Sequence, residues 1–195
     1  RYIGGLPMIK KKGIFNFDYM FSEISDIFIP LDRKTFLTSE TDFTNCVTNC
    51  LTGNPEYINK HSADKIYPAL RASSSMPVLS PEVYIDNIPY LDGGITDAIP
   101  YKRAIDDGCD RIVVIPTRQH GYRKSFTPRY LEKIYLKTYY KYPNLIKSLL
   151  HTPVMYSRQM DEIDKLALEK RILVIRPEKP IDISRTEKDA SKLIE

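Results

Sequence analysis

A carboxylate followed directly by two glycines, Asp92-Gly93-Gly94, is the part of this sequence best suited to chemistry. The glycines place no side chain in the way of a substrate or a second backbone, so the carboxylate can project into a cleft and accept a proton there. The same tripeptide is typical of a plain turn, because Asp accepts hydrogen bonds from downstream amides and Gly adopts positive φ without strain. Taken alone, the tripeptide leaves both interpretations open.

The residues around the tripeptide predict which secondary-structure elements flank it. Residues 70–75 predict the last turn of a helix, which must end before Pro77 because the residue preceding a proline is displaced from the α region. Residues 83–91 predict an extended segment interrupted by an Asp86-Asn87 turn. Pro100 suits the first turn of a following helix, where its missing N–H costs nothing. Asp92 is therefore expected at the end of an extended segment between two helices.

This order of parts resembles the patatin-like phospholipases, a family of serine acyl hydrolases, and most closely their bacterial branch. The matching motifs are Arg-Ala-Ser-Ser-Ser-Met-Pro at 71–77, Asp-Gly-Gly at 92–94 and Asp-Ala-Ile-Pro at 97–100. The resemblance implies a Ser-Asp dyad in which Asp92 accepts the proton of the serine that attacks an acyl ester, with Gly93 and Gly94 as its neighbours in the active-site motif. It implies a phospholipase or esterase acting in lipid degradation, with a lipid or acyl-ester substrate and no cofactor or metal.

The nucleophile that such an enzyme needs has no counterpart in this sequence. A serine of this kind lies in G-x-S-x-G, and no serine here has glycine two residues before and two residues after it. The run Ser73-Ser74-Ser75 lies at a helix end before a proline, and in the family it is a structural neighbour of the active site. The glycine-rich oxyanion loop is also missing, so we expect the chain alone to be inactive. The alternative is a non-catalytic lipid- or protein-binding module on the same fold, in which Asp92 is only a turn residue.

The expected fold class is α/β, with a three-layer α/β/α patatin-like core and a mostly parallel sheet that lacks its N-terminal strand-helix units. Continuous apolar runs at 111–116 and 171–177 predict strands buried on both faces, as in a parallel sheet. Further elements are predicted as strands at 43–50 and 57–59 and as helices at 101–107, 128–142 and 154–170. We expect residues 1–195 to be the C-terminal part of a single patatin-like domain. Its parts are an opening segment at 1–33, a core with the Asp-Gly-Gly motif at 34–117, and a helical C-terminal extension with a final strand at 118–195.

Composition sets limits on the class of protein. With 195 residues, of which 42% are hydrophobic, the chain can form one domain with a sizeable core. The 3 cysteines are few and odd in number, which argues against a disulfide framework, and Cys46 and Cys50 are expected to be free thiols. Zinc binding by this pair is not expected, because no second clustered pair of ligands exists. The sequence shows neither a long apolar stretch nor a signal-peptide pattern, so we expect a cytoplasmic protein.

One basic segment, residues 118–147, carries eight Lys or Arg side chains against a single acid, Glu132, with tyrosines between them. Four of these cations fall at a spacing of four residues: Arg129, Lys133, Lys137 and Lys141. They are interpreted either as a solvated helix face or as a peripheral contact with an anionic membrane, where cations meet headgroups and tyrosines suit the interface. Nucleic acid is not expected, because the chain lacks a nucleic-acid-binding motif and a strongly basic domain.

Overall fold

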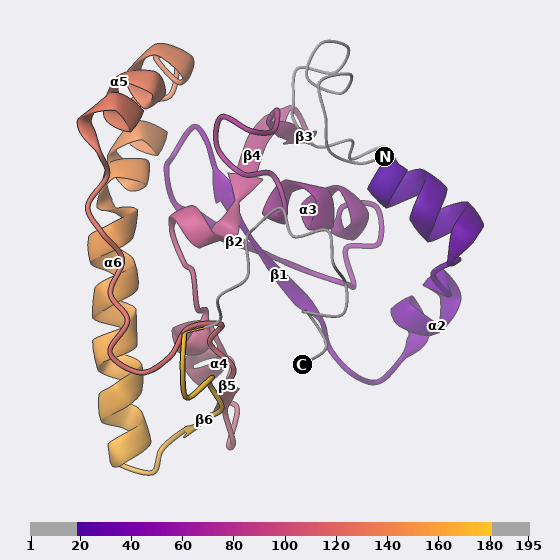
Figure 1. Ribbon diagram of the computed structural model, residues 1–195. Helices are drawn as coiled ribbons and strands as arrows, with labels where there is room; N and C mark the ends of the chain where they lie inside the picture. The colour runs from indigo at the N-terminus through magenta and orange to yellow at the C-terminus, as the bar shows by residue number, and fades with distance from the viewer. Residues whose placement is uncertain (1–18, 181–195) are drawn as a thin grey trace. The chain divides into compact units, whose positions relative to one another are not determined.

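The computed structural model describes residues 19–180, and the chain divides into two compact units (Figure 1). Among the described residues, the first unit contains 19–98 together with 125–156, and the second contains 99–124 together with 157–180. Helix α6 (Pro143–Leu168) contributes its first part to the first unit and the remainder to the second. The first unit has two clusters of buried hydrophobic side chains, and the second unit has one.

A four-stranded antiparallel sheet with strand order β2-β1-β4-β3 forms the centre of the first unit. Its strands are β1 (Thr44–Asn49), β2 (Pro55–Asn59), β3 (Val83–Ile85) and β4 (Ile88–Asp92). In the register of the central pair, Val47 of β1 lies opposite Asp92 of β4. The β3–β4 hairpin turns at Asp86 and Asn87, whose φ angles of 51° and 63° are those of a tight two-residue turn. The hairpin thus leads directly into the candidate site.

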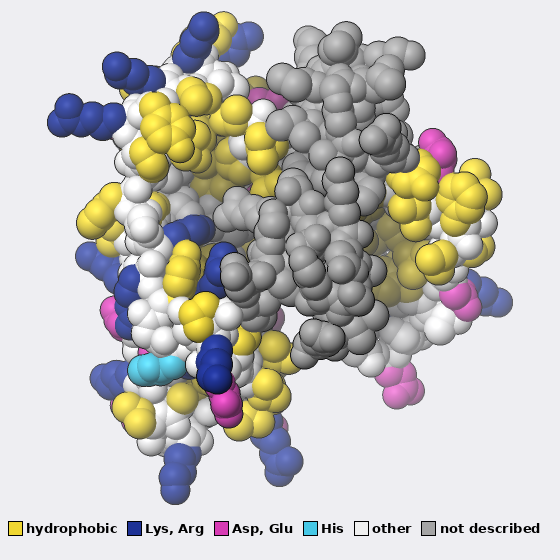
Figure 2. All heavy atoms as spheres, in the orientation of Figure 1, with side chains coloured by type: hydrophobic (Ala, Val, Ile, Leu, Met, Phe, Trp, Pro, Cys, Tyr) yellow, Lys and Arg dark blue, Asp and Glu magenta, His cyan; other side chains and the backbone are white. Residues whose placement is uncertain are grey.

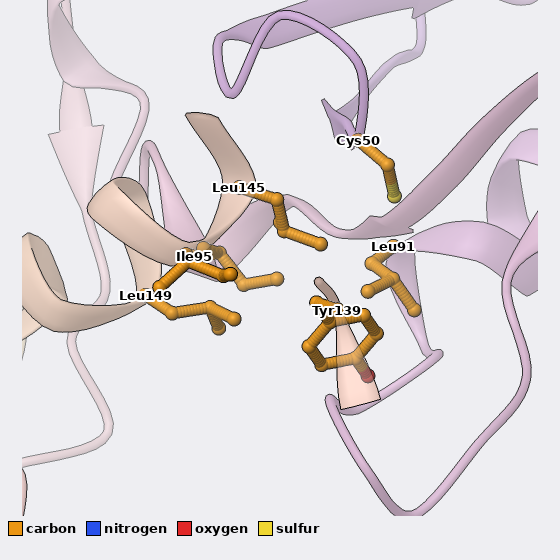
Figure 3. Close-up of a cluster of buried hydrophobic side chains, with 7 residues drawn as sticks. Cys50, Leu91, Ile95, Tyr139, Leu145 and Leu149 are labelled. Atoms are coloured by element: carbon orange, nitrogen blue, oxygen red, sulfur yellow. The ribbon is translucent and has the colours of Figure 1, made fainter. Parts of the chain in front are cut away.

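Helices cover both faces of this sheet. Successive residues of a strand point to opposite faces, so Tyr90 and Leu91 enter different clusters. Tyr90 packs in a cluster with Ala69 and Ala72 of helix α3 (Ile66–Ser73). Leu91 packs in the cluster that contains Leu145 of α6 (Figure 3). The first unit is therefore layered as helix, sheet and helix.

The cluster on the Leu91 side of the sheet includes Tyr139, the residue that follows helix α5 (Arg129–Thr138). The buried members of this cluster are Cys50, Leu91, Ile95, Tyr139, Leu145, Ile146 and Leu149 (Figure 3). Tyr139 follows α5 directly, and its hydroxyl accepts a hydrogen bond of 2.8 Å from the main-chain N–H of Val78. Burial raises the pKa of Tyr139 to about 12, so this hydroxyl stays protonated at neutral pH.

The segment before β1 consists of the π-helix η1 (Tyr19–Phe28) and the short helix α2 (Arg33–Thr38). The side chain of Asp32 caps α2 by accepting a hydrogen bond of 2.9 Å from the N–H of Thr35. Lys60, which is only 1% exposed, donates from its ammonium to the carbonyls of Ser39 and Thr41, the latter at 2.6 Å. The end of α2 is thereby joined to the end of β2.

The second unit contains helix α4 (Tyr101–Asp106), the strands β5 (Val113–Val114) and β6 (Leu173–Val174), and the last part of α6. The two strands pair in parallel, and the long stretch of chain between them allows this, because parallel strands need a crossover connection. Its buried cluster consists of Tyr101, Val114, Ile163 and Ile172. The hydroxyl of Tyr101 donates to Glu162, which also pairs with Lys102 at 2.6 Å.

The sheet differs from the expectation of a mostly parallel one. The four-stranded sheet is antiparallel throughout, and among residues 19–180 the parallel pairing is that of β5 with β6. The short turns that join β1 to β2 and β3 to β4 explain the difference, because strands joined by such turns pair antiparallel. The prediction of strands buried on both faces at 111–116 and 171–177 was wrong. Val113 is 52% and Ile115 is 71% exposed in the first run, and Leu173 is 59% and Ile175 is 52% exposed in the second. The fold class that stands is a mixed α/β one.

Two helices also differ from their predicted ranges. Helix α5 ends at Thr138, so Lys141 lies beyond it and the predicted range 128–142 was too long. Helix α6 begins at Pro143 rather than at 154 and contains Pro153 in its interior. The apolar contacts of Leu145 and Leu149 with the sheet stabilise the first turns of α6 despite this proline.

The predicted strands at 43–50 and 57–59 are confirmed as β1 and β2, and the helix at 101–107 is confirmed as α4. The predicted extent of one domain over residues 1–195 stays a prediction. In the described part of the chain, none of the helices combines the length and the apolar character needed to cross a membrane.

Candidate functional site

Asp92 is the last residue of β4 and caps the short 3-10 helix η2 (Gly93–Ile95). Its carboxylate oxygen Oδ1 accepts a hydrogen bond of 2.8 Å from the N–H of Gly94, and its own N–H donates to the carbonyl of Ser75 at 3.1 Å. The side chain is half-buried. The strand and the turn therefore hold the carboxylate in one position, because both its main chain and its side chain are bonded.

The two glycines after Asp92 serve different purposes. A Cβ at Gly93 would lie 2.3 Å from the carbonyl oxygen of Cys46, so this glycine is needed for the close approach of the turn to β1. A Cβ at Gly94 would lie 3.1 Å from Oδ1 of Asp92 and no closer than that to any other group. Gly93 therefore serves the packing of the turn, whereas Gly94 leaves space around the carboxylate.

A pair of threonines joins the turn to β1. The hydroxyl of Thr48, which is fully buried, donates to the carbonyl of Asp92 at 2.8 Å and lies 2.8 Å from the hydroxyl of Thr96. A hydroxyl has one proton and a carbonyl only accepts, so the proton between the two threonines comes from Thr96. Both ends of η2 are thus bonded to one buried side chain. No local pattern in the sequence indicates this role, because a threonine within a strand is common.

A second carboxylate lies on the same turn. Asp97, which is 9% exposed, accepts a hydrogen bond from the hydroxyl of Tyr57, and its N–H donates to the carbonyl of Gly93 at 2.8 Å. Burial, with smaller contributions from the charges of Asp97 and Asp92, raises the pKa of Cys46 to about 12. Cys46 is therefore a neutral thiol near neutral pH and not a nucleophile.

Two serines of the run that precedes Pro77 bond to main-chain carbonyls of their own helix. The hydroxyls of Ser74 and Ser75 donate to the carbonyls four residues earlier, those of Leu70 at 3.0 Å and Arg71 at 2.9 Å. Ser75 reaches Asp92 through its main-chain carbonyl, as given above. The hydroxyls of Ser74 and Ser75 are therefore engaged within their own helix, and the carbonyl of Ser75 positions the end of the strand.

The remaining candidate groups lie elsewhere. Arg129, Lys133 and Lys137 are exposed on α5, and Lys141 is exposed after its end. Cys46 and Cys50 are free thiols, and no group of three or more His, Cys, Asp or Glu side chains within residues 19–180 is placed to hold a metal ion.

A comparison with known proteins identifies the family of this chain. The patatin-like phospholipase family matches residues 2–105, just over half of the chain, and this range includes Asp92 and both glycines. The chain therefore belongs to the patatin-like phospholipase family, which is a family of lipid hydrolases. Residues 142–195 match a second family, a domain of unknown function designated DUF6363.

The chain is also similar to the uncharacterized protein YjjU of Escherichia coli (strain K12). The two are 34% identical over 115 residues, which make up 57% of this chain and 31% of that protein. The matched region thus covers less than a third of the length of this relative.

Proposed function

We propose that this chain carries the general base of a lipid acyl hydrolase that uses a Ser-Asp dyad, with Asp92 as the base. The observation that carries the proposal is the position of Asp92, whose carboxylate stands at a strand end and is held by the Gly94 N–H at 2.8 Å, within the family match. The nucleophilic serine is supplied by a G-x-S-x-G turn outside these 195 residues.

In this mechanism Asp92 accepts the proton of the serine hydroxyl while the serine oxygen attacks the ester carbonyl. The same proton passes to the leaving alkoxide as the acyl-enzyme forms. Water then attacks the acyl group, and Asp92 accepts a proton from this water. The bond between the serine oxygen and the acyl group breaks, the proton passes from Asp92 to the serine oxygen, and the fatty acid leaves. The bond from Gly94 keeps Oδ1 in place, and the missing side chain at Gly94 leaves the carboxylate accessible to the serine.

Peripheral contact with an anionic membrane through α5, in the cytoplasm, is part of the proposal. Three cations of α5 are exposed, and Tyr130, at 67%, is exposed beside them. In Figure 2, Lys and Arg side chains project on the side where Figure 1 places α5, with hydrophobic side chains between them. Cations beside amphipathic and apolar side chains suit the boundary between headgroups and acyl chains.

The test is hydrolysis of a medium-chain chromogenic ester by the complete protein that contains this chain, compared with its Asp92→Asn variant. Asp86→Asn is the matched control, because Asp86 lies in the exposed turn of the same hairpin, where its positive φ also suits Asn. We expect kcat of Asp92→Asn to fall by at least about a thousandfold, as is typical when an activated nucleophile loses its base. Asp86→Asn should keep its activity.

Retention of activity in Asp92→Asn would exclude Asp92 as the base. A folded complete protein without any ester hydrolysis would favour the non-catalytic binding module instead.

A further inference from the structure

The side chains on both sides of the Asp-Gly-Gly turn pack against helix α6. Leu91 directly precedes Asp92, and Ile95 directly follows the two glycines. Both belong to the buried cluster that contains Leu145 and Leu149 of α6 (Figure 3). Moving the turn away from α6 would expose this apolar surface to water, which costs free energy. Helix α6 therefore limits how far the turn can move.

A hydrogen bond from α6 reaches the end of η2, the short helix that follows Asp92. The hydroxyl of Thr152 donates to the main-chain carbonyl of Ile95 at 2.8 Å. Ile95 is the last residue of η2, and carbonyls at a helix end have no partner within the helix. Because Ile95 is only 5% exposed, water cannot readily replace this donor. The bond from Thr152 thus satisfies a carbonyl that the short helix itself leaves without a donor.

A second carbonyl competes for the single proton of the Thr152 hydroxyl. The carbonyl of Ser148, four residues earlier on α6, lies 2.9 Å from this hydroxyl, and such a bond is common for a threonine inside a helix. In the α-helical pattern, however, the Ser148 carbonyl already accepts from the main-chain N–H of Thr152. The carbonyl of Ile95 stands at a helix end, so it gains more from the proton.

The path from Ile95 back to the carboxylate is short and bonded throughout. The N–H of Thr96, the next residue, donates to the carbonyl of Gly93 at 3.1 Å. The N–H of Gly94 donates to Oδ1 of Asp92 at 2.8 Å. A shift of the last carbonyl of η2 would therefore move the N–H that holds the carboxylate.

We infer that Thr152 is a positioning residue for the proposed base, and that the first part of α6 belongs to the hydrolase site. The inference rests on the proposed function and extends it to a segment beyond the patatin-like match. That match ends at residue 105, whereas Thr152 lies within 142–195, the range of the domain of unknown function. Thr152 acts through η2, by holding the turn on which the carboxylate of Asp92 stands.

Ser148 provides a matched control on the same side of α6, one turn earlier. Its hydroxyl donates to the carbonyl of Gly53 at 2.6 Å, in the turn after β1. Like the hydroxyl of Thr152, it also lies within reach of the carbonyl four residues earlier, that of Asn144 at 3.1 Å. Ser148→Ala therefore removes the same kind of bond between α6 and a turn, but the turn is not the one that carries Asp92.

The first arm of the test measures amide hydrogen exchange of the complete protein by mass spectrometry and needs no substrate. We expect residues 92–97 to exchange roughly tenfold faster in Thr152→Val, because η2 opens more easily without this bond. Thr152→Ser keeps the hydroxyl and should keep the slow exchange. Ser148→Ala should leave the exchange of residues 92–97 unchanged. Equal exchange of these residues in Thr152→Val and the unaltered protein, or equal acceleration by Ser148→Ala, would overturn the inference.

The second arm measures kcat and KM for hydrolysis of a medium-chain chromogenic ester. We expect Thr152→Val to lower kcat by roughly tenfold with little change in KM, because substrate contacts remain while the base is less well placed. Thr152→Ser should recover most of the lost kcat, and Ser148→Ala should keep it. An unchanged kcat in Thr152→Val would overturn the positioning role. If the unaltered complete protein hydrolyses no ester, the proposed function fails, and the first arm still decides whether Thr152 holds the turn.

Discussion

The buried hydroxyl of Thr48 donates a hydrogen bond of 2.8 Å to the main-chain carbonyl of Asp92, although the two residues lie on different strands of the sheet. The bond fixes the main chain of Asp92 from the side of β1, while Gly94 fixes its carboxylate. The direction in which the carboxylate points depends on both. Thr48 is therefore a positioning residue for the proposed base.

Replacement of Thr48 by valine keeps the shape of the side chain and removes its hydroxyl. We expect kcat for ester hydrolysis to fall by roughly tenfold with little change in KM, because substrate contacts remain while the base is less well placed. The free energy of unfolding should fall by about 1–3 kcal/mol, since a buried carbonyl loses its donor. Kinetics of the complete protein and urea unfolding measure the two effects.

The control for this prediction is Thr44→Val, which makes the same change at an exposed position of the same strand. Thr48→Ser should recover most of the lost kcat, because it restores the donor. Equal kcat in Thr48→Val and the unaltered protein would show that the bond does not position Asp92.

The two glycines of the motif should separate stability from activity. Gly93→Ala places a methyl group 2.3 Å from the carbonyl oxygen of Cys46, so we expect little folded protein. Gly94→Ala places its methyl group 3.1 Å from Oδ1 of Asp92, so we expect a folded protein with reduced ester hydrolysis. Circular dichroism and thermal unfolding measure the first effect, and kcat measures the second. A folded Gly93→Ala protein would contradict the packing argument, and full activity in Gly94→Ala would contradict the role of the open space.

Local signals in the sequence predicted the elements next to the candidate site well. The Asp86-Asn87 turn, the helix that ends before Pro77 and the strand at Thr44–Asn49 depend on neighbouring residues in the chain, and all three are found. The direction of strand pairing depends on which strands meet, and local patterns do not contain that information. Strands β1 to β4 pair antiparallel, whereas β5, within the run at 111–116, pairs in parallel with β6. The run was interpreted as buried on both faces, whereas Val113 and Ile115 are largely exposed.

The parts of the site that were not predicted depend on distant contacts. Thr48 and Thr96 meet across 48 positions of the chain, and Ser148 bonds Gly53 across 95. No local sequence pattern distinguishes Thr48, Thr96 or Ser148 from other residues with hydroxyl side chains. Pro153 lies inside α6 although a proline in a helix interior removes a main-chain hydrogen bond, so tertiary packing of α6 outweighs this local cost.

The three cysteines should differ in reactivity. Cys50 is buried and Cys46 is half-buried, and burial raises the pKa of each thiol to about 12, whereas Cys109 is exposed. Only a thiolate reacts readily with iodoacetamide. We therefore expect labelling at pH 8 to modify Cys109 in the folded protein and to reach Cys46 and Cys50 only after unfolding in urea, as peptide mapping by mass spectrometry can show. Rapid labelling of Cys46 in the folded protein would contradict its neutral state.

The same pKa shift predicts a loss of stability at alkaline pH. The pKa of Cys46 is near 9 for an ordinary thiol and about 12 in the folded chain, so between these values the unfolded chain releases a proton that the folded chain keeps. The contribution to stability is complete below pH 9 and declines as the pH rises through this window. Urea unfolding at pH 7.5 and 10 should show a smaller decline in Cys46→Ala than in the unaltered protein. Cys109→Ala is the control and should show the full decline.

The buried ammonium of Lys60 should contribute to the stability of the segment before β1. It donates to the carbonyls of Ser39 and Thr41, and Lys60→Met would keep most of the side-chain volume while removing these bonds. In Lys60→Met the lost hydrogen bonds lower the free energy of unfolding, whereas the removal of a buried charge raises it. Because the ammonium bonds two carbonyls and also the Ser39 hydroxyl at 3.1 Å, we expect the loss to be larger, with a net destabilisation of about 1–3 kcal/mol.

Limited proteolysis distinguishes this effect from a general loss of stability. In Lys60→Met the peptide bonds between Ser39 and Thr41 should be cleaved faster than in the unaltered protein, because the end of α2 is no longer joined to β2. Lys34→Met is the control, since Lys34 lies exposed on α2. The prediction fails if both variants are cleaved at the rate of the unaltered protein and unfold at the same urea concentration. The hydrogen bonds of Lys60 would then do no more than offset the cost of burying its charge. The segment would instead be held to the sheet by the packing of Phe36 against Phe43, whose ring centres lie 5.5 Å apart.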